Sequence, residues 1–365
     1  MKKIFRSISF ILALALAFLL LGATATAYIS PVTLHVFTLA GFGFPALWML
    51  NLILLVWFLI RKRQWFALIP LPVLLLTINH WNNTFQMRGR KIDNTQTLEL
   101  PLKVMSYNTR MFDYYRHSGM SETPDNIYDF ITSRDPDVVC FQEFYSNVTR
   151  PQYNPSYIMA RFKQYKFKHI EYVYKSHSGS GIATFSKYPI VDKGDIRFEQ
   201  SNNMSIYTDI NVKGKVVRVF NNHLESIGFR TADLQVLDSL EFRINARQRQ
   251  GLERILQKLN RAFAMRAEQS EVIARHIANS PYPVIVCGDF NDTPVSYVYR
   301  TMRGKLRDAF RESGFGFGGT YNGKLPSLRI DYIFHSPEFD ACNFTQFNVK
   351  YSDHYPIMTT INLKK

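Results

Sequence analysis

The hydrophobic positions of this chain follow two different patterns, one before and one after about residue 100. The first part contains three long apolar runs, at residues 8–28, 36–60 and 65–81, each close to the roughly 20 residues that cross a bilayer core. The remainder alternates short apolar, strand-like runs with helical patterns. We therefore predict a membrane region with three transmembrane helices over residues 1–83, a linker over residues 84–100, and one α/β domain over residues 101–365.

Basic residues at the ends of the apolar runs predict an orientation. They precede the first run and separate the second from the third, and such residues stay on the cytoplasmic side. The N-terminus and the loop at residues 61–63 are then inside, and the domain after the third run is extracytoplasmic. The residues concerned are Lys2, Lys3, Arg6, Arg61, Lys62 and Arg63.

Two features leave alternatives open. Residues 2–27 also resemble a cleaved signal peptide, because the small residues at 23–27 offer cleavage positions; removal of this segment keeps the domain on the same face. The third run is the weakest of the three, since it is short and contains Pro70 and Pro72. Its failure to span would place the domain inside.

The domain is expected to be built from strands with helices between them. A helix should begin near Thr123, as its cap, with Pro124 in the first turn. The cysteines Cys140, Cys287 and Cys342 lie outside any metal-binding or redox spacing, so we expect core residues. The expected strands are residues 103–107, 138–141, 181–185, 216–221, 284–287 and 330–334.

Polar side chains recur where these strands begin or end. Any one of them could cap a helix or close a turn, but six recurrences indicate one site assembled at the strand ends. The most informative segment is VIVCGDFND, which delivers Asp289, Asn291 and Asp292 at the mouth of an apolar strand. The other residues are Asn108, Gln142, Glu143, His223, Asp331, Asp353 and His354.

The motifs that carry these residues resemble the endonuclease/exonuclease/phosphatase superfamily. They are, in order, SYNTRMF, PDVVCFQE, GSGIATFSKYPI, NNHLES, GDFNDTP, RIDYIF and SDHYPI. The resemblance covers about residues 101–363 and excludes the membrane region. It implies a four-layer α/β sandwich, in which two packed mixed β-sheets are flanked by helices and the site lies at the strand ends.

The resemblance also implies roles for the polar residues. Asn108, Glu143 and Asp353 would hold Mg²⁺ or Mn²⁺, consistent with the preference of Mg²⁺ for hard oxygen ligands. Asp289 and Asn291 would orient and activate the attacking water. His354, held by Asp331, and His223 would contact the phosphate and, as cations, stabilise the charge that develops in the transition state.

The implied activity is metal-dependent, in-line hydrolysis of a phosphate ester, with nucleic acid or a phospholipid headgroup as the substrate. We expect a nuclease-like enzyme; a sphingomyelinase-like or phosphoinositide-like lipid phosphoesterase is the alternative. A catalytically silent, membrane-bound scaffold is the alternative from another class. Residues 101–365 carry 35 basic and 27 acidic residues, a net charge of +8, which favours a phosphate-rich substrate without distinguishing nucleic acid from lipid.

A long connection between His223 and Val284 contains an amphipathic helical pattern. Leu252, Ile255, Leu256 and Leu259 mark one face. The segment is either a helix packed on the domain or a basic arm that faces anionic lipid or a polyanionic substrate. Its basic residues are Arg243, Arg247, Arg249, Arg254, Lys258 and Arg261.

Overall fold

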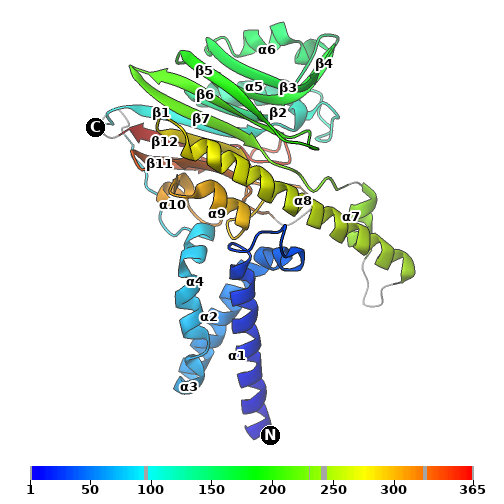
Figure 1. Cartoon of the computed structure of the whole chain (residues 1–365), viewed down its shortest axis with the longest axis vertical. Coiled ribbons are helices and arrows are strands. Elements are labelled where there is room, and N and C mark those ends of the chain that lie inside the picture. The colour runs from blue at the N-terminus through cyan, green and yellow to red at the C-terminus, as the bar shows by residue number, and fades with distance from the viewer. Residues whose placement is uncertain (1, 94–97, 230, 240–244, 324–326, 364–365) are drawn as a thin grey trace. The chain divides into compact units, whose positions relative to one another are not determined.

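The computed structural model describes residues 2–93, 98–229, 231–239, 245–323 and 327–363. The chain divides into two compact units. The first, here called the helical unit, comprises Met1–Asn83, Glu225–Ser270 and Thr293–Arg300, and the second, called the sheet unit, comprises the rest. Figure 1 shows their elements.

The helical unit begins with the apolar helices. They are α1 (Lys2–Ala25), the 3₁₀ helix η1 (His35–Gly43), α2 (Phe44–Ile60), α3 (Gln64–Ala67) and α4 (Pro70–Thr84). Two helical segments among the described residues, Ser7–Ala25 and Thr38–Ile60, are long and apolar enough to cross a membrane. Helix α4 has only 15 residues. The unit also contains α7 (Thr231–Asp238) and the first part of α8 (Ala246–Ala278).

The sheet unit contains two mixed six-stranded sheets. The first sheet has the order β11-β12-β1-β2-β4-β3, and only β1 and β2 are parallel in it. Its strands are β1 (Pro101–Asn108), β2 (Val138–Asn147), β3 (Phe167–Lys175), β4 (Ser178–Ser186), β11 (Phe339–Gln346) and β12 (Ile357–Leu363).

The second sheet has the order β5-β6-β7-β8-β10-β9, with β7 and β8 parallel. Its strands are β5 (Ile190–Arg197), β6 (Met204–Val212), β7 (Lys215–His223), β8 (Val284–Asp289), β9 (Arg307–Asp308) and β10 (Asp331–His335). The remaining helices among the described residues are η3 (Arg110–Asp113), α5 (Thr123–Arg134), η4 (Pro151–Tyr153), α6 (Pro155–Arg161), α9 (Tyr297–Arg303) and α10 (Ala309–Ser313).

Alternation along the strands explains how the two sheets pack. In β2, Val138 and Cys140 belong to a core shared with Ile285 and Cys287 of β8, whereas Val139 and Phe141 face the opposite way, into an aromatic core with α5 and α6. Successive side chains of a strand point to opposite faces. The result is two mixed sheets packed on each other with flanking helices, the predicted α/β sandwich.

The structure confirms most of the expected elements and corrects the start of one helix. Each predicted strand overlaps an observed one, and all three cysteines are buried and unpaired. Helix α5 begins at Thr123, one residue earlier than expected, and Glu122 occupies the cap position. Thr123 Oγ1 donates a hydrogen bond to the Met120 carbonyl oxygen. The prediction that Thr123 caps the helix is therefore wrong by one position.

The predicted amphipathic helix lies within α8, and its buried face is partly confirmed. Ile255 and Leu259 are buried, but Leu256 is 45% exposed, so it does not belong to that face. Arg254 and Arg261 are exposed, whereas Lys258 pairs with Asp233. Arg243 and the side chain of Arg247 lie outside the described residues.

Gly288 allows the two parallel strands of the second sheet to approach each other. Its φ is +139°, and an added Cβ would lie 2.0 Å from the backbone oxygen of Asn222. We expect Gly288→Ala to lower the free energy of unfolding by more than about 3 kcal/mol, since both strain and overlap are introduced. Gly214→Ala is the control, because Gly214 also has a positive φ but open space around it. Equal denaturation midpoints for the two variants would contradict the prediction.

Candidate functional site

The parallel strand pairs bring the predicted residues to one edge of the sandwich. In the first sheet Asn108 of β1 lies opposite Gln142 of β2, and in the second His223 of β7 lies opposite Asp289 of β8. Asp331, the first residue of the antiparallel strand β10, also lies opposite Asp289. The carboxyl ends of parallel strands meet at one edge, and loops at such edges commonly carry function.

Glu143 reaches this edge because β2 is irregular at that point. The pairing of β2 with β4 shifts register between Phe141 and Phe144, and Glu143 has a φ of +52°. A bulge of this kind redirects a side chain, and a positive φ is strained for a residue other than glycine. The Glu143 side chain keeps 33% of its surface exposed.

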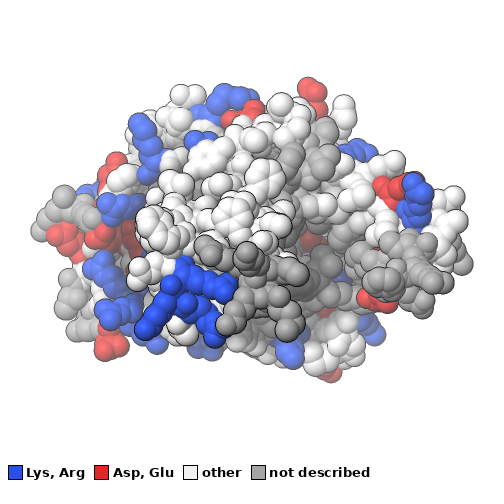
Figure 2. Space-filling model, turned by 90° about the horizontal axis from the view of Figure 1, so that it is seen from below, with Lys and Arg blue, Asp and Glu red and all other residues white. Residues whose placement is uncertain are grey.

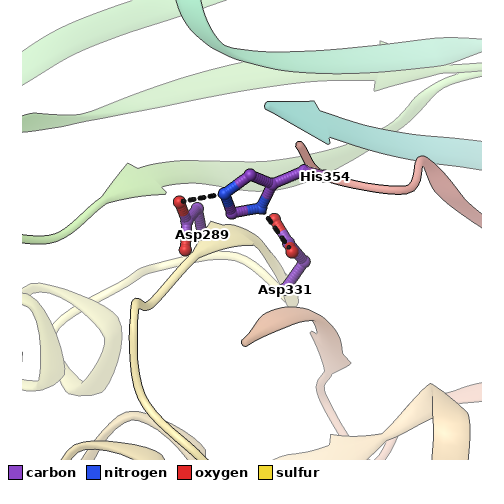
Figure 3. A group of neighbouring side chains, drawn as sticks. All are labelled: Asp289, Asp331 and His354. Carbon is purple, nitrogen blue, oxygen red and sulfur yellow. Dashed lines mark hydrogen bonds and ion pairs between the residues drawn. The ribbon is translucent and has the colours of Figure 1, made fainter. Parts of the chain in front are cut away.

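His354 is held between two buried carboxylates, as Figure 3 shows. Its Nδ1 lies 2.9 Å from Asp331 Oδ2, and its Nε2 lies 3.6 Å from Asp289 Oδ2. Burial by itself lowers the pKa of His354, but the charges of Asp331 and Asp289 outweigh it, so the pKa is raised well above the usual value. The two carboxylates therefore favour the cationic form of the imidazole.

Asp289 is a buried carboxylate with several hydrogen-bond donors around it. It accepts from Asn108 Nδ2 at 3.0 Å, from the Asn291 backbone N–H at 2.8 Å and from Asn291 Nδ2 at 3.2 Å. Burial and the negative charge of Asp331 together raise its pKa to about 6, in spite of the opposing effects of His354 and His223. This value lies close to neutral pH, as suits a general base.

His223 and Asn108 connect the Asp289 carboxylate to Glu143. His223 Nε2 lies 3.8 Å from Asp289 Oδ2 and 3.9 Å from Glu143 Oε1, which are distances of ion pairs and not of hydrogen bonds. Asn108 Nδ2 donates to both carboxylates, at 3.0 Å and 3.3 Å. One cluster thus contains two imidazoles and three acidic groups, counting Asp331.

The charges around Glu143 fit a divalent cation. Burial and the negative charge of Asp353 raise the pKa of Glu143, and Arg110 Nε lies 3.4 Å from Asp353 Oδ2. Two carboxylates that repel each other are stabilised by a cation between them. Asn108 fits less directly, because its Oδ1 accepts from the Arg110 backbone N–H at 3.0 Å and would have to turn to become a ligand.

A second acidic group could also hold a metal. Asp289, Asp331 and His354 are all buried and offer ligand atoms within 4.8 Å of one another. However, a protonated His354 already offsets one of the two carboxylate charges, since each ring nitrogen faces a carboxylate. A metal there would have to displace that proton, so Glu143 and Asp353 are the better ligands.

The sequence did not indicate several residues that hold the site together. Ser352 Oγ donates to the Asn108 carbonyl oxygen at 2.8 Å, and Thr320 Oγ1 accepts from the Asp331 backbone N–H at 3.1 Å. The Tyr321 ring lies edge-on to His354, with centroids 5.7 Å apart. Gln142, which the sequence did single out, lies inside β2 and not at its end; it bridges the sheets by donating to Asn221 Oδ1 at 2.6 Å, a structural contact.

Comparison with protein families decides the affiliation of the chain. Residues 105–354 match the model of the Endonuclease/Exonuclease/phosphatase family. The chain belongs to this family. Residues 2–84 match a separate model, described as a domain of unknown function (DUF8431). No curated protein matches the chain.

Several solved structures share the fold of this chain at low sequence identity. An endonuclease/exonuclease/phosphatase from Beutenbergia cavernae is 18% identical with a TM-score of 0.51, covering 73% of this chain and 72% of that one. A family protein from Bacteroides thetaiotaomicron is 18% identical (TM-score 0.50; 73% and 98% covered). The human Nocturnin catalytic domain with bound sulfate is 17% identical (TM-score 0.50; 73% and 95% covered).

Proposed function

We propose that this chain is a membrane-anchored phosphoesterase that depends on Mg²⁺ or Mn²⁺ and hydrolyses a phosphate ester by in-line attack of water. The observation that carries the proposal is the arrangement around His354, where a cationic imidazole and a carboxylate with a pKa of about 6 lie 3.6 Å apart. Cationic and basic groups of this kind are what a phosphate ester and an attacking water require. Membership of the family supports the reaction class.

We assign each residue of the site a role in the reaction through a particular side-chain atom. Asp289 Oδ2 accepts the proton of the attacking water, while Asn291 fixes the carboxylate through two N–H groups. His354 and His223 direct ring N–H groups toward the phosphate oxygens; their Nε2 atoms lie 3.6–3.9 Å from the carboxylates of Asp289 and Glu143. Asp331 holds His354 cationic and oriented.

Glu143 and Asp353 would hold the divalent ion, with Asn108 as a third ligand after rotation of its amide. When bound, the ion polarises the phosphate and stabilises the charge that develops on it. Arg110, which lies beside Asp353, balances the negative charge of the ligands.

Contacts within the helical unit support a membrane anchor with three crossings. Phe66 of α3 contacts Phe10 of α1 and Phe58 of α2, with ring centroids 5.7 Å and 5.5 Å apart. Farther along, Trp81 of α4 stacks on Trp48 of α2 at 4.1 Å. Residues 66–81 therefore run alongside α1 and α2, as Figure 1 also shows, and span the same layer in spite of the short α4.

The positive-inside rule then gives an orientation for this anchor. Arg61 and Lys62 are exposed in the loop after α2, at the end of the bundle where Phe58 and Phe66 meet. Seen from below, the surface carries several separate groups of Lys and Arg atoms, one of them beside a broad area without charged atoms (Figure 2). Basic loops stay cytoplasmic, so we place the opposite end of the bundle and the catalytic domain outside the cytoplasm.

Removal of metal tests the proposal. We expect EDTA to reduce hydrolysis of bis-p-nitrophenyl phosphate by the full-length protein by about 10²-fold, and Mg²⁺ or Mn²⁺ to restore it, because the ion supplies several kcal/mol of transition-state stabilisation. Glu143→Gln should weaken Mg²⁺ binding in calorimetry by more than about tenfold. Glu171→Gln is the control and should leave Mg²⁺ binding unchanged, because Glu171 lies in β3 and pairs with Arg197. Activity unaffected by chelation excludes the mechanism, and absence of metal binding in the native protein favours the silent scaffold.

A further inference from the structure

The helical unit contains two segments that the sequence places inside the catalytic domain. Glu225–Ser270 follows directly after His223 and Leu224, and Thr293–Arg300 follows directly after Asn291 and Asp292. Both segments therefore begin next to catalytic residues of the sheet unit. They belong to the helical unit, which contains the candidate membrane spans. We refer to them as the first and second docking segments.

Both docking segments contact the same end of the apolar helices. In the second segment, the Val295 carbonyl oxygen accepts a hydrogen bond from Thr26 Oγ1 at 3.1 Å, and the Arg300 guanidinium lies 4.6 Å from the centre of the Tyr28 ring. In the first segment, Phe263 of α8 contacts Phe42 of η1 with ring centroids 5.9 Å apart. Two independent segments thus pack on the residues between α1 and α2.

The contacted end is the one opposite the basic loop. Thr26 follows directly on the candidate span Ser7–Ala25, and the Tyr28 hydroxyl lies 3.2 Å from His80 Nε2, near the end of α4. Arg61 and Lys62 lie at the other end, beyond α2. Thr26 and Tyr28 lie just beyond the first span, and Phe42 lies near the start of the second, Thr38–Ile60. Because the contacts are made at these ends of the spans, the docking segments lie close to the level of the lipid headgroups.

The length of the chain limits how far the catalytic residues can be from this level. Asn291 precedes Val295 by four residues, and four residues span at most about 14 Å when fully extended. The limit holds for any orientation of the two units. This greatest distance is of the same order as the thickness of the headgroup layer, which adds roughly 5–8 Å on each side of the hydrocarbon core.

We propose that the docking segments hold the catalytic residues at the bilayer surface and that the substrate is a phosphate ester carried by a membrane lipid. The inference rests on the proposed hydrolytic function and adds the substrate class. A lipid phosphate lies within the headgroup layer, whereas a nucleic acid gains nothing from a site fixed there. The exposed Arg254 and Arg261 do not favour a nucleic acid either, since helical periodicity places both opposite the buried Ile255 and Leu259, outside the docking contacts.

The test uses two substrates with the same leaving group. The full-length protein in lipid nanodiscs is given either a p-nitrophenyl phosphodiester of dioleoylglycerol, inserted in the disc, or soluble bis-p-nitrophenyl phosphate. We expect the lipid ester to be hydrolysed with at least a tenfold higher kcat/KM, because the anchor creates a high effective concentration. Plasmid DNA serves as the third substrate.

A glycine substitution separates docking from chemistry. A Cβ at Gly41 would lie 2.7 Å from the Val295 carbonyl oxygen and 2.9 Å from Thr26 Oγ1, whereas a Cβ at Gly22 meets nothing within 4 Å. We expect Gly41→Ala to lower kcat/KM for the lipid ester roughly tenfold and to leave soluble-ester turnover within twofold. Gly22→Ala should change neither. Thr26→Val, which removes only the hydrogen bond, should have the same selective effect to a smaller degree.

The outcomes distinguish the two proposals. Hydrolysis of neither ester by the native protein contradicts the proposed function itself. Three other outcomes contradict the docking inference alone. They are hydrolysis of the soluble ester without preference for the lipid ester, preference for DNA, and equal loss of activity on both esters in Gly41→Ala and Thr26→Val.

Discussion

Replacement of His354 by alanine is expected to lower kcat for a phosphodiester by about 10³-fold. The imidazole lies between Asp289 and Asp331, whose charges favour its cationic form, and its Nε2 is the group that we expect to donate to a phosphate oxygen. Positioned acid or base groups contribute roughly 10²- to 10⁴-fold. Steady-state kinetics in the presence of saturating Mg²⁺ measures the effect, and His354→Gln, which keeps a polar side chain between the carboxylates, should lose nearly as much.

His169→Ala provides the control for this experiment. His169 is also a buried histidine near an acid, with Nε2 3.4 Å from Glu171 Oε1 and Nδ1 2.9 Å from Thr208 Oγ1, but it lies in β3, away from the candidate site. Its loss should lower the thermal midpoint without a comparable fall in turnover per folded molecule. If both variants lost activity in proportion to their folded fraction, His354 would have a structural role only.

Local patterns in the sequence predicted an α/β domain and the convergence of polar residues at strand ends, whereas the sandwich of two sheets was predicted only through the family resemblance. Alternating apolar residues mark the strands, and polar residues that follow them mark the edge where parallel strands end. Asn108, His223 and Asp289 obey this rule directly, as their register shows. Asp331 could be placed beside Asp289 only through the family resemblance, since antiparallel pairing of β10 and β8 brings its first residue to the same edge.

Other features depend on geometry that no sequence pattern encodes. Gln142 and Glu143 are neighbours in the same polar island, yet the bulge in β2 directs Glu143 to the site, while Gln142 bonds to Asn221 between the sheets. Tyr321 approaches His354 from a loop without any motif. These positions follow from long-range packing and from one positive φ, to which hydrophobic periodicity is insensitive.

The sequence patterns did not predict the docking segments either. The predicted boundaries assign residues 101–365 to one domain, and an amphipathic helix in that range is expected to pack on the domain to which it belongs. Phe263 packs instead on Phe42, more than two hundred residues earlier in the chain. Long-range partners of an apolar face cannot be chosen from its periodicity, because every apolar surface offers the same attraction.

Replacement of Asp289 by asparagine is the second large effect that we expect. The amide has nearly the shape of the carboxylate and can still accept the hydrogen bond from the Asn291 backbone N–H, but it cannot take a proton from water. We expect kcat to fall by about 10³-fold, while KM changes by less than about threefold because the substrate phosphate does not bind to a carboxylate. Asp209→Asn is the control, since Asp209 is also buried, in β6, and pairs with Arg218 at 2.6 Å.

Combination of Asp289→Asn with His354→Ala tests whether the two residues act as one unit. Their side chains lie 3.6 Å apart and share the transfer of charge to the phosphate ester. Groups that act together show strongly non-additive losses, so we expect the double variant to be little slower than the slower single variant. A loss equal to the product of the two single losses would show that each residue contributes independently, and Asp289 would then act on the water without help from the imidazole that faces it.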